Sequence, residues 1–131
     1  MIVRRVPLAL SVLLSFVVLF SPGSDVPGAP PGVDKVIHFS LFALLALTGR
    51  WAGIRPVPLG VGLVCYAVAS EFIQAYAPIS RDGSVADALA DTLGMLAGVG
   101  LAAVVARNRP RRTNPQRVGH TNKSVRRPSD P

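Results

Sequence analysis

Two acidic residues of this chain, Glu71 and Asp91, lie inside long apolar segments, where a carboxyl group is least expected. An acid near the centre of a membrane-spanning helix costs roughly 2.5–3.5 kcal/mol, and less toward the helix ends. Several such groups from different segments suggest a site. Six further polar residues lie within the apolar segments or close to their ends and complete the candidate set: Asp34, Lys35, His38, Gln74, Arg81 and Asp87. This set could bind a polar ligand, transfer protons or hold helices together.

The spacing of these residues places them on shared helix faces, because residues three or four apart in a helix are neighbours. Three pairs have this spacing, one in each of three segments: Asp34 with His38, Glu71 with Gln74, and Asp87 with Asp91. The last pair continues through Gly94 and Gly98, small residues that let helix backbones approach closely in lipid. We therefore expect this stripe to face the other helices, and it favours packing within the chain over dimer formation.

Two aspartates one turn apart, Asp87 and Asp91, would repel each other if both were ionised. Either one of them keeps its proton, or a cation neutralises the pair. The available cations are Arg81, His38 and Lys35. The sequence alone leaves both solutions open.

Most of the candidate residues also have a plainer interpretation. Asp34 could cap the second helix, and Asp87 could form a capping box with Ser84 at the start of the fourth. Lys35 could extend its ammonium group to the membrane interface, and His38 could be a packed histidine. The two acids inside apolar segments are harder to explain in this way, so for them we favour a buried polar network.

Four apolar segments position the candidate residues, at about 6–20, 36–54, 57–76 and 85–106. Half of the 131 residues are hydrophobic, 16% are charged, and the mean hydropathy is +0.43. Soluble domains typically have about 25% charged residues. A spanning helix needs roughly 17–25 residues, which the last three segments provide and the first provides only with its flanks. The sequence therefore predicts an all-α fold, a four-helix transmembrane bundle over residues 1–106.

The basic residues are distributed unevenly, and the cytoplasmic flanks of membrane helices collect Lys and Arg. Eight of the fourteen follow Ala106, Arg4 and Arg5 precede the first segment, and Arg50 and Arg55 flank the second connection. Both chain ends and that connection are therefore predicted to be cytoplasmic, which requires an even number of spans. Six of the seven acids fall on the opposite, outer side: Asp25, Asp34, Glu71, Asp82, Asp87 and Asp91. Because topology explains the positive charge, we do not expect nucleic-acid binding.

The two ends of the chain lead to separate predictions. Arg4 and Arg5 before an apolar run resemble a signal peptide, but no small-x-small cleavage site follows, so we expect a retained anchor. Residues 107–131 are basic, rich in proline and nearly free of apolar residues, which predicts a disordered cytoplasmic tail. The tail could contact anionic lipid or a partner, or it could act only as a topology determinant. Cys65, the single cysteine, allows no disulfide within the chain and is interpreted as a core residue.

Three motifs recur in the same order as in a known family. They are Asp34-Lys35-Val36-Ile37-His38-Phe39, then Ser70-Glu71-Phe72-Ile73-Gln74, then Arg81 and Asp87 ahead of Thr92-Leu93-Gly94. Between about Asp34 and Gly98 the chain resembles the VanZ-like family of small bacterial membrane proteins, whose pattern is D-K-x-x-H-F, E-x-x-Q, an Arg and D-x-x-x-N-x-x-G. Asp91 stands where that pattern usually has Asn. The resemblance implies a multi-pass protein of the bacterial plasma membrane with a link to glycopeptide-antibiotic resistance.

Three classes of function remain open for such a protein, whose surroundings are membrane lipids. In the first, an outward-facing polar pocket binds a lipid-linked or glycopeptide ligand, with Arg81 and Lys35 on its phosphate or carboxylate. In the second, His38 with Glu71 or Asp87 is the acid–base pair of an enzyme acting on an envelope lipid. In the third, the polar network only specifies helix packing, or docks a partner span or a second copy. One histidine with carboxylates at these spacings matches no metal signature, so neither a metal nor a cofactor is predicted.

Overall fold

The fold is entirely helical in the part of the chain that the computed structural model describes, residues 2–21, 32–76 and 84–108. After a short 3₁₀ turn at Ile2–Arg4, four α-helices follow: α1 (Val6–Phe20), α2 (Val33–Trp51), α3 (Pro56–Tyr76) and α4 (Val85–Arg107). The predicted all-α class with four helices is confirmed within these ranges. The candidate residue Arg81 and residues 109–131 of the predicted tail lie outside them.

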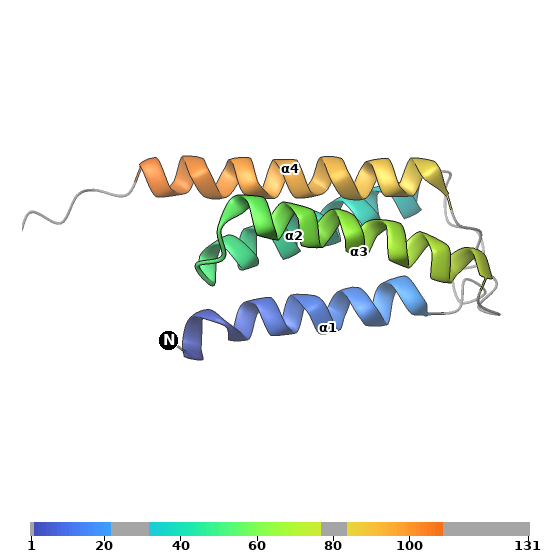
Figure 1. The fold of residues 1–131 in the computed structure, drawn as a ribbon, viewed down its shortest axis with the longest axis horizontal. Helices are drawn as coiled ribbons and strands as arrows, with labels where there is room; N and C mark the ends of the chain where they lie inside the picture. Colours follow the sequence, from blue (N-terminus) through green and yellow to red (C-terminus); the bar gives the residue numbers. More distant parts are fainter. Residues whose placement is uncertain (1, 22–31, 77–83, 109–131) are drawn as a thin grey trace, which may run out of the picture.

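The helices alternate in direction along one long axis (Figure 1). α4 and α1 lie on opposite sides of the molecule in this view, with α2 and α3 between them. The start of α1, the α2–α3 turn and the end of α4 share one end of the bundle. The end of α1, the start of α2, the end of α3 and the start of α4 share the other. Residues far apart in the sequence are thereby brought together at each end.

α2 begins and ends about three residues earlier than the predicted segment 36–54. Its end is determined by Gly53, whose φ of 93° lies in the left-handed region that favours glycine. The Gly53 N–H donates to the Arg50 carbonyl (3.1 Å), and the Ile54 N–H donates to the Gly49 carbonyl (3.1 Å). These two bonds form a Schellman motif, which satisfies carbonyl groups that the helix end leaves free. The prolines that follow therefore start α3 rather than end α2.

The start of α2 differs from the prediction that Asp34 caps this helix. Gly32 occupies the N-cap position with a φ of 90°, and Asp34 lies in the first turn. A carboxylate in the first turn still interacts favourably with the positive end of the helix dipole. Asp34 is therefore an exposed first-turn residue rather than the cap.

Two glycines bring the backbones of α2 and α4 into close contact. A methyl group added at Gly94 would overlap the carbonyl oxygen of Phe39, and one added at Gly98 would overlap that of Ala43. Both glycines are buried, on the same face of α4 as its two buried aspartates. The carboxylates of this face are therefore held close to α2.

α1 joins the bundle through polar contacts as well as through the core. The Ser15 hydroxyl lies 3.1 Å from the hydroxyl of Tyr66 on α3. The side-chain amide of Gln74 donates to the carbonyl of Leu19 (2.9 Å), in the last turn of α1. Leu19 is fully buried in a hydrophobic core that includes Phe42 of α2. The two hydrogen bonds thus connect α1 to α3 at separate heights along the bundle.

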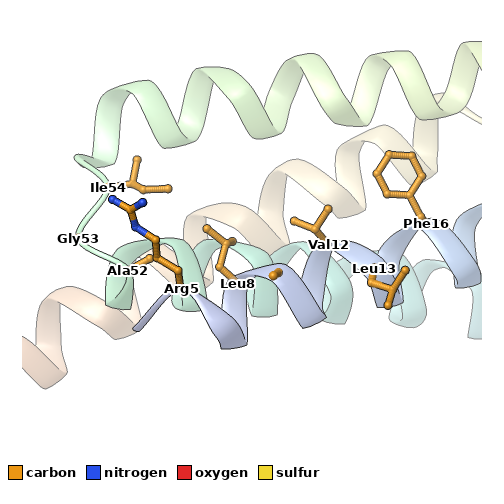
Figure 2. Close-up of a pocket in the computed structure, with 9 residues that line it drawn as sticks. Arg5, Leu8, Val12, Leu13, Phe16, Ala52, Gly53 and Ile54 are labelled. Carbon is orange, nitrogen blue, oxygen red and sulfur yellow. The ribbon is translucent and has the colours of Figure 1, made fainter. Parts of the chain in front are cut away.

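An apolar hollow lies between α1 and the α2–α3 turn (Figure 2). It has a volume of about 830 Å³, and its lining includes Arg5, Leu8, Phe16 and Ile54. None of the candidate residues lines it. The hollow begins at the end of the bundle where α1 starts, away from the starts of α2 and α4.

Two of the helices, α3 and α4, are long and apolar enough to cross a membrane. Only 22% of the apolar window of each is buried within the chain, whereas the core helix of a soluble protein is mostly buried. Among the described residues, 28 large apolar side chains are exposed, and nine hydrophobic and nine polar or charged residues are buried. Cys65 is exposed as well, so its interpretation as a core residue was wrong. The described surface is rich in large apolar groups, and the interior is unusually polar.

Candidate functional site

His38 and Asp91 form a fully buried pair between α2 and α4. The Nδ1 atom of His38 lies 3.0 Å from Oδ1 of Asp91, and neither side chain is exposed (0%). The backbone contact between Gly94 and Phe39 is next to this pair in both helices, and it holds the two side chains within reach. A buried carboxylate needs a partner of this kind, because an unpaired charge in an apolar interior is very unfavourable. The pair lies at the centre of a polar cluster that also contains Glu71, Asp87 and Lys35.

Glu71 of α3 lies against the same histidine. Its Oε1 atom is 3.6 Å from Nδ1 of His38, and its Oε2 atom accepts a hydrogen bond from the backbone N–H of Ser84 (2.6 Å). Ser84 is the N-cap residue of α4, but its side chain makes no capping bond. The predicted capping box with Asp87 is therefore wrong, because a carboxylate from a neighbouring helix takes the N–H that the box would satisfy. Glu71 connects α3 both to α2 and to the start of α4.

Asp87, one turn before Asp91 on α4, has a cation of its own. The Nζ atom of Lys35 lies 3.4 Å from Oδ1 of Asp87, whose side chain is buried. The Lys35 side chain is 51% exposed, so this pair reaches the surface. The repulsion expected between the two aspartates is thus offset by two separate partners, Lys35 for one and His38 for the other.

Three further candidate residues lie at the edge of the cluster or outside it. Asp34 is exposed, and a carboxylate oxygen of Asp34, a ring nitrogen of His38 and a carboxylate oxygen of Asp87 all lie within 4.8 Å of one another. Gln74 is buried but points to α1, where it binds the Leu19 carbonyl. Arg81 belongs to residues 77–83, which the structure does not describe.

The cluster is richer in hydrogen-bond acceptors than in donors. Four of its buried side-chain atoms have no hydrogen-bond partner among the described residues: His38 Nε2, Glu71 Oε1, Asp87 Oδ1 and Asp91 Oδ2. Two of them make ion contacts, Glu71 Oε1 with His38 and Asp87 Oδ1 with Lys35. The Oδ2 atom of Asp91 and the Nε2 atom of His38 have neither kind of contact in the described ranges. Buried polar atoms without partners are uncommon and often mark a place where a ligand, ion or water binds.

The sequence pointed to these residues but only to part of their pairing. It matched His38 with Glu71 or Asp87, and Glu71 does contact His38 at 3.6 Å, but Asp91 lies closer, at 3.0 Å. It also missed Ser84 as a partner of Glu71, because that bond uses a backbone N–H. Contacts between residues 13 to 53 positions apart leave no periodic signal in a single sequence.

The fold and the cluster together define a small helical protein with a buried ionisable site at one end of the bundle. Comparison with known proteins adds no relative, since no protein-family model, no curated protein and no solved structure matches the chain. The resemblance to the VanZ-like family therefore depends on the three sequence motifs alone.

Proposed function

We propose that the chain is a multi-pass protein of the bacterial plasma membrane, with α1 to α4 as its four spans. α3 and α4 have the length and hydropathy of membrane spans. α2 has 19 residues and carries its charged groups, Asp34, Lys35 and Arg50, in its first and last turns, where a span meets the lipid headgroups. α1 has 15 residues and would span with its flanks or with local thinning of the bilayer.

The distribution of side chains supports a lipid environment. The exposed Val, Leu, Ile and Phe side chains occur on every helix, while the three acidic side chains of α3 and α4 are buried. In water, this amount of exposed apolar surface would favour association. In a bilayer it has no such cost, and only the polar groups must find partners inside the protein.

The charges of the described residues support one orientation. All four acids, Asp34, Glu71, Asp87 and Asp91, belong to the end formed by the starts of α2 and α4 and the end of α3. The opposite end carries five arginines: Arg4, Arg5, Arg50, Arg55 and Arg107. Because basic residues collect on the cytoplasmic side, the acidic end would face outward and both chain ends would be cytoplasmic.

At the outer end, the polar cluster would bind the headgroup of a lipid-linked or glycopeptide ligand. The observation that carries this proposal is the graded exposure of the cluster: the exposed residues Asp34 and Lys35 lie against the buried side chain of Asp87, and Asp34 also lies within 4.8 Å of the buried His38. The half-exposed ammonium group of Lys35 could bind a phosphate or carboxylate, as Lys side chains commonly do. The motifs shared with the VanZ-like family contain the same residues, so a role in glycopeptide-antibiotic resistance is part of this proposal.

A second candidate is an acid–base enzyme at the same site, which the 3.0 Å contact between His38 and Asp91 favours. A carboxylate that orients an imidazole is a common arrangement for general base catalysis. Both side chains are fully buried, however, and a substrate would reach them only if neighbouring groups moved. Ligand binding at Lys35 needs no such movement, so it is the preferred proposal.

Native mass spectrometry of the full chain, purified in mild detergent, tests the ligand proposal. The wild-type protein should retain an anionic envelope lipid, and the Lys35→Ala variant should lose most of it. Lys35 is the only lysine or arginine that the structure describes at this end of the bundle. Arg5→Ala is the matched control, since it removes a basic residue at the opposite end. Absence of a bound lipid in the wild type, or equal retention by the Lys35→Ala variant, would contradict the proposal.

A further inference from the structure

We propose that His38, Glu71 and Asp91 together bind one divalent metal ion, of the zinc or manganese type, at the junction of α2, α3 and α4. Each residue offers one ligand atom, and these atoms all lie within 4.8 Å of one another. All three residues are buried, and each comes from a different helix. The site would join the three helices directly, and it does not depend on the ligand proposed above.

The distances within the group match those between ligands of a single ion. Nitrogen and oxygen ligands lie about 2.1 Å from zinc, manganese or magnesium, so two ligands are about 3.0 Å apart at a right angle and about 3.4 Å apart at a tetrahedral angle. The Nδ1 atom of His38 lies 3.0 Å from Asp91 Oδ1 and 3.6 Å from Glu71 Oε1. An ion would take the place of the proton on the ring nitrogen with only small side-chain movements. Its remaining coordination positions would be free for water or for an oxygen of a ligand.

The charges and the atoms without partners also suit a cation. Two carboxylates face one imidazole, so the ionised group carries a net negative charge even when the imidazole is protonated. A divalent ion with a neutral imidazole would balance both carboxylates, as a buried site requires. Glu71 Oε1 accepts no hydrogen bond from the described residues and is available as a ligand atom, and the second oxygen of Asp91, Oδ2, also accepts none and could join Oδ1 on the ion.

The neighbouring group of Asp34, His38 and Asp87 fits a metal less well. Lys35 already places a positive charge 3.4 Å from Asp87, and Asp34 is exposed. By contrast, the described residues place no lysine or arginine within 4.0 Å of Glu71 or Asp91. The Ser84 N–H also holds the second oxygen of Glu71 in place, in the way that outer hydrogen bonds commonly orient metal ligands.

The kind of ion follows from the donor atoms. One imidazole nitrogen with two carboxylate oxygens suits borderline ions such as zinc, manganese or ferrous iron, and sulfur ligands are absent from the group. The sequence did not predict this site, because metal signatures are recognised by spacing along the chain. Here the ligands are 20 to 53 residues apart and meet only in the folded bundle.

Metal analysis of the full chain in detergent tests the proposal. The protein is treated with a chelator, dialysed and then titrated separately with zinc and manganese, with bound metal measured by mass spectrometry. We expect about one equivalent per chain for at least one of these ions, and a higher melting temperature with the ion than with the chelator. A wild-type protein that binds neither ion stoichiometrically would overturn the proposal.

Two conservative variants and one control locate the site. Asp91→Asn and Glu71→Gln preserve side-chain shape and should weaken metal binding by at least about tenfold. Asp87→Asn removes a buried carboxylate of the same helix, already paired with Lys35, and should retain most of the binding. Equal weakening by Asp87→Asn and Asp91→Asn would overturn the assignment to this group. If Asp91→Asn does not fold, the wild-type stoichiometry and the Glu71→Gln titration still decide the question.

Discussion

At the residue scale, the two ion pairs that the aspartates of α4 form differ in how far the basic partner is exposed. His38 and Asp91 are both fully buried, whereas Lys35 is half exposed beside Asp87. A buried pair that loses one member leaves an uncompensated charge or an unsatisfied polar group, which is costly. A pair with one half-exposed member is partly screened by solvent and contributes less. The His38–Asp91 pair should therefore dominate the contribution of charged contacts to stability.

Substitution of Asp91 tests this difference. Asp91→Ala should lower the free energy of unfolding by about 3–5 kcal/mol, because the fully buried imidazole of His38 loses its nearest partner. Asp91→Asn should cost clearly less, because the amide oxygen can still accept a hydrogen bond from the imidazole. Denaturant unfolding in detergent with a chelator present measures both values without any contribution from bound metal.

Lys35→Ala is the control for that experiment. Because the Lys35 ammonium group is half exposed and water can approach its place beside Asp87, its loss should cost clearly less than the loss of Asp91. A Lys35→Ala variant as unstable as Asp91→Ala would show that burial does not separate the two pairs.

At the element scale, the contact between α2 and α4 positions the cluster. Gly94 and Gly98 let the two backbones touch, and the buried aspartates lie on the same face of α4. The Schellman motif at Gly53 ends α2 where the chain must turn, and Pro56 starts α3. α3 then runs back so that Glu71 reaches the same level as His38. The end of α2 and the start of α3 therefore have local causes, and the cluster results from these together with the contact between α2 and α4.

Two alanine substitutions in α4 separate packing from helix propensity. Gly94→Ala should destabilise the bundle by about 1–3 kcal/mol or more, because the added methyl group overlaps the backbone of Phe39. Gly100→Ala is the matched control, since no atom lies within 4 Å of a methyl group there, and it should be neutral or stabilising by up to about 1 kcal/mol. Thermal unfolding in detergent compares the two. A Gly94→Ala variant as stable as Gly100→Ala would contradict the packing described here.

At the scale of the whole molecule, the two ends of the bundle differ in charge. The described acids gather at one end and five of the six described basic residues at the other, with Lys35 as the exception. The helices between them expose mainly apolar side chains. This arrangement suits a chain that crosses a bilayer with its arginine-rich end in the cytoplasm.

Cysteine labelling in intact cells tests that orientation. In a Cys65→Ser background, a membrane-impermeant thiol reagent added from outside should label a cysteine at Ser24 but not one at Ser129. The two positions lie in the first connection and in the C-terminal tail, which the proposed topology places on opposite sides. Labelling of both positions from the same side would refute the four-span topology.

The helical class, the approximate helix positions and the residues of the cluster could all be predicted from the amino-acid sequence. Apolar segments of sufficient length predict helices, and ionisable residues within them stand out because their burial is costly. The same signals could not predict the end of α2, because the Gly53 turn competes with an apolar pattern that continues past it. The sequence signals also suggested that Asp34 and Asp87 cap helices. Whether a side chain caps a helix depends on which of the free N–H groups other parts of the chain already satisfy.

Which side chains meet depends on the packing of the helices and could not be predicted from the sequence. The contact of His38 with Asp91, the bond from Ser84 to Glu71 and the pairing of Lys35 with Asp87 all join different helices or distant positions. Such contacts depend on the axial shift and the rotation of each helix relative to its neighbours. For α2 and α4, the glycine contacts determine both. Residue types thus identify the members of the site, while helix packing determines which of them pair.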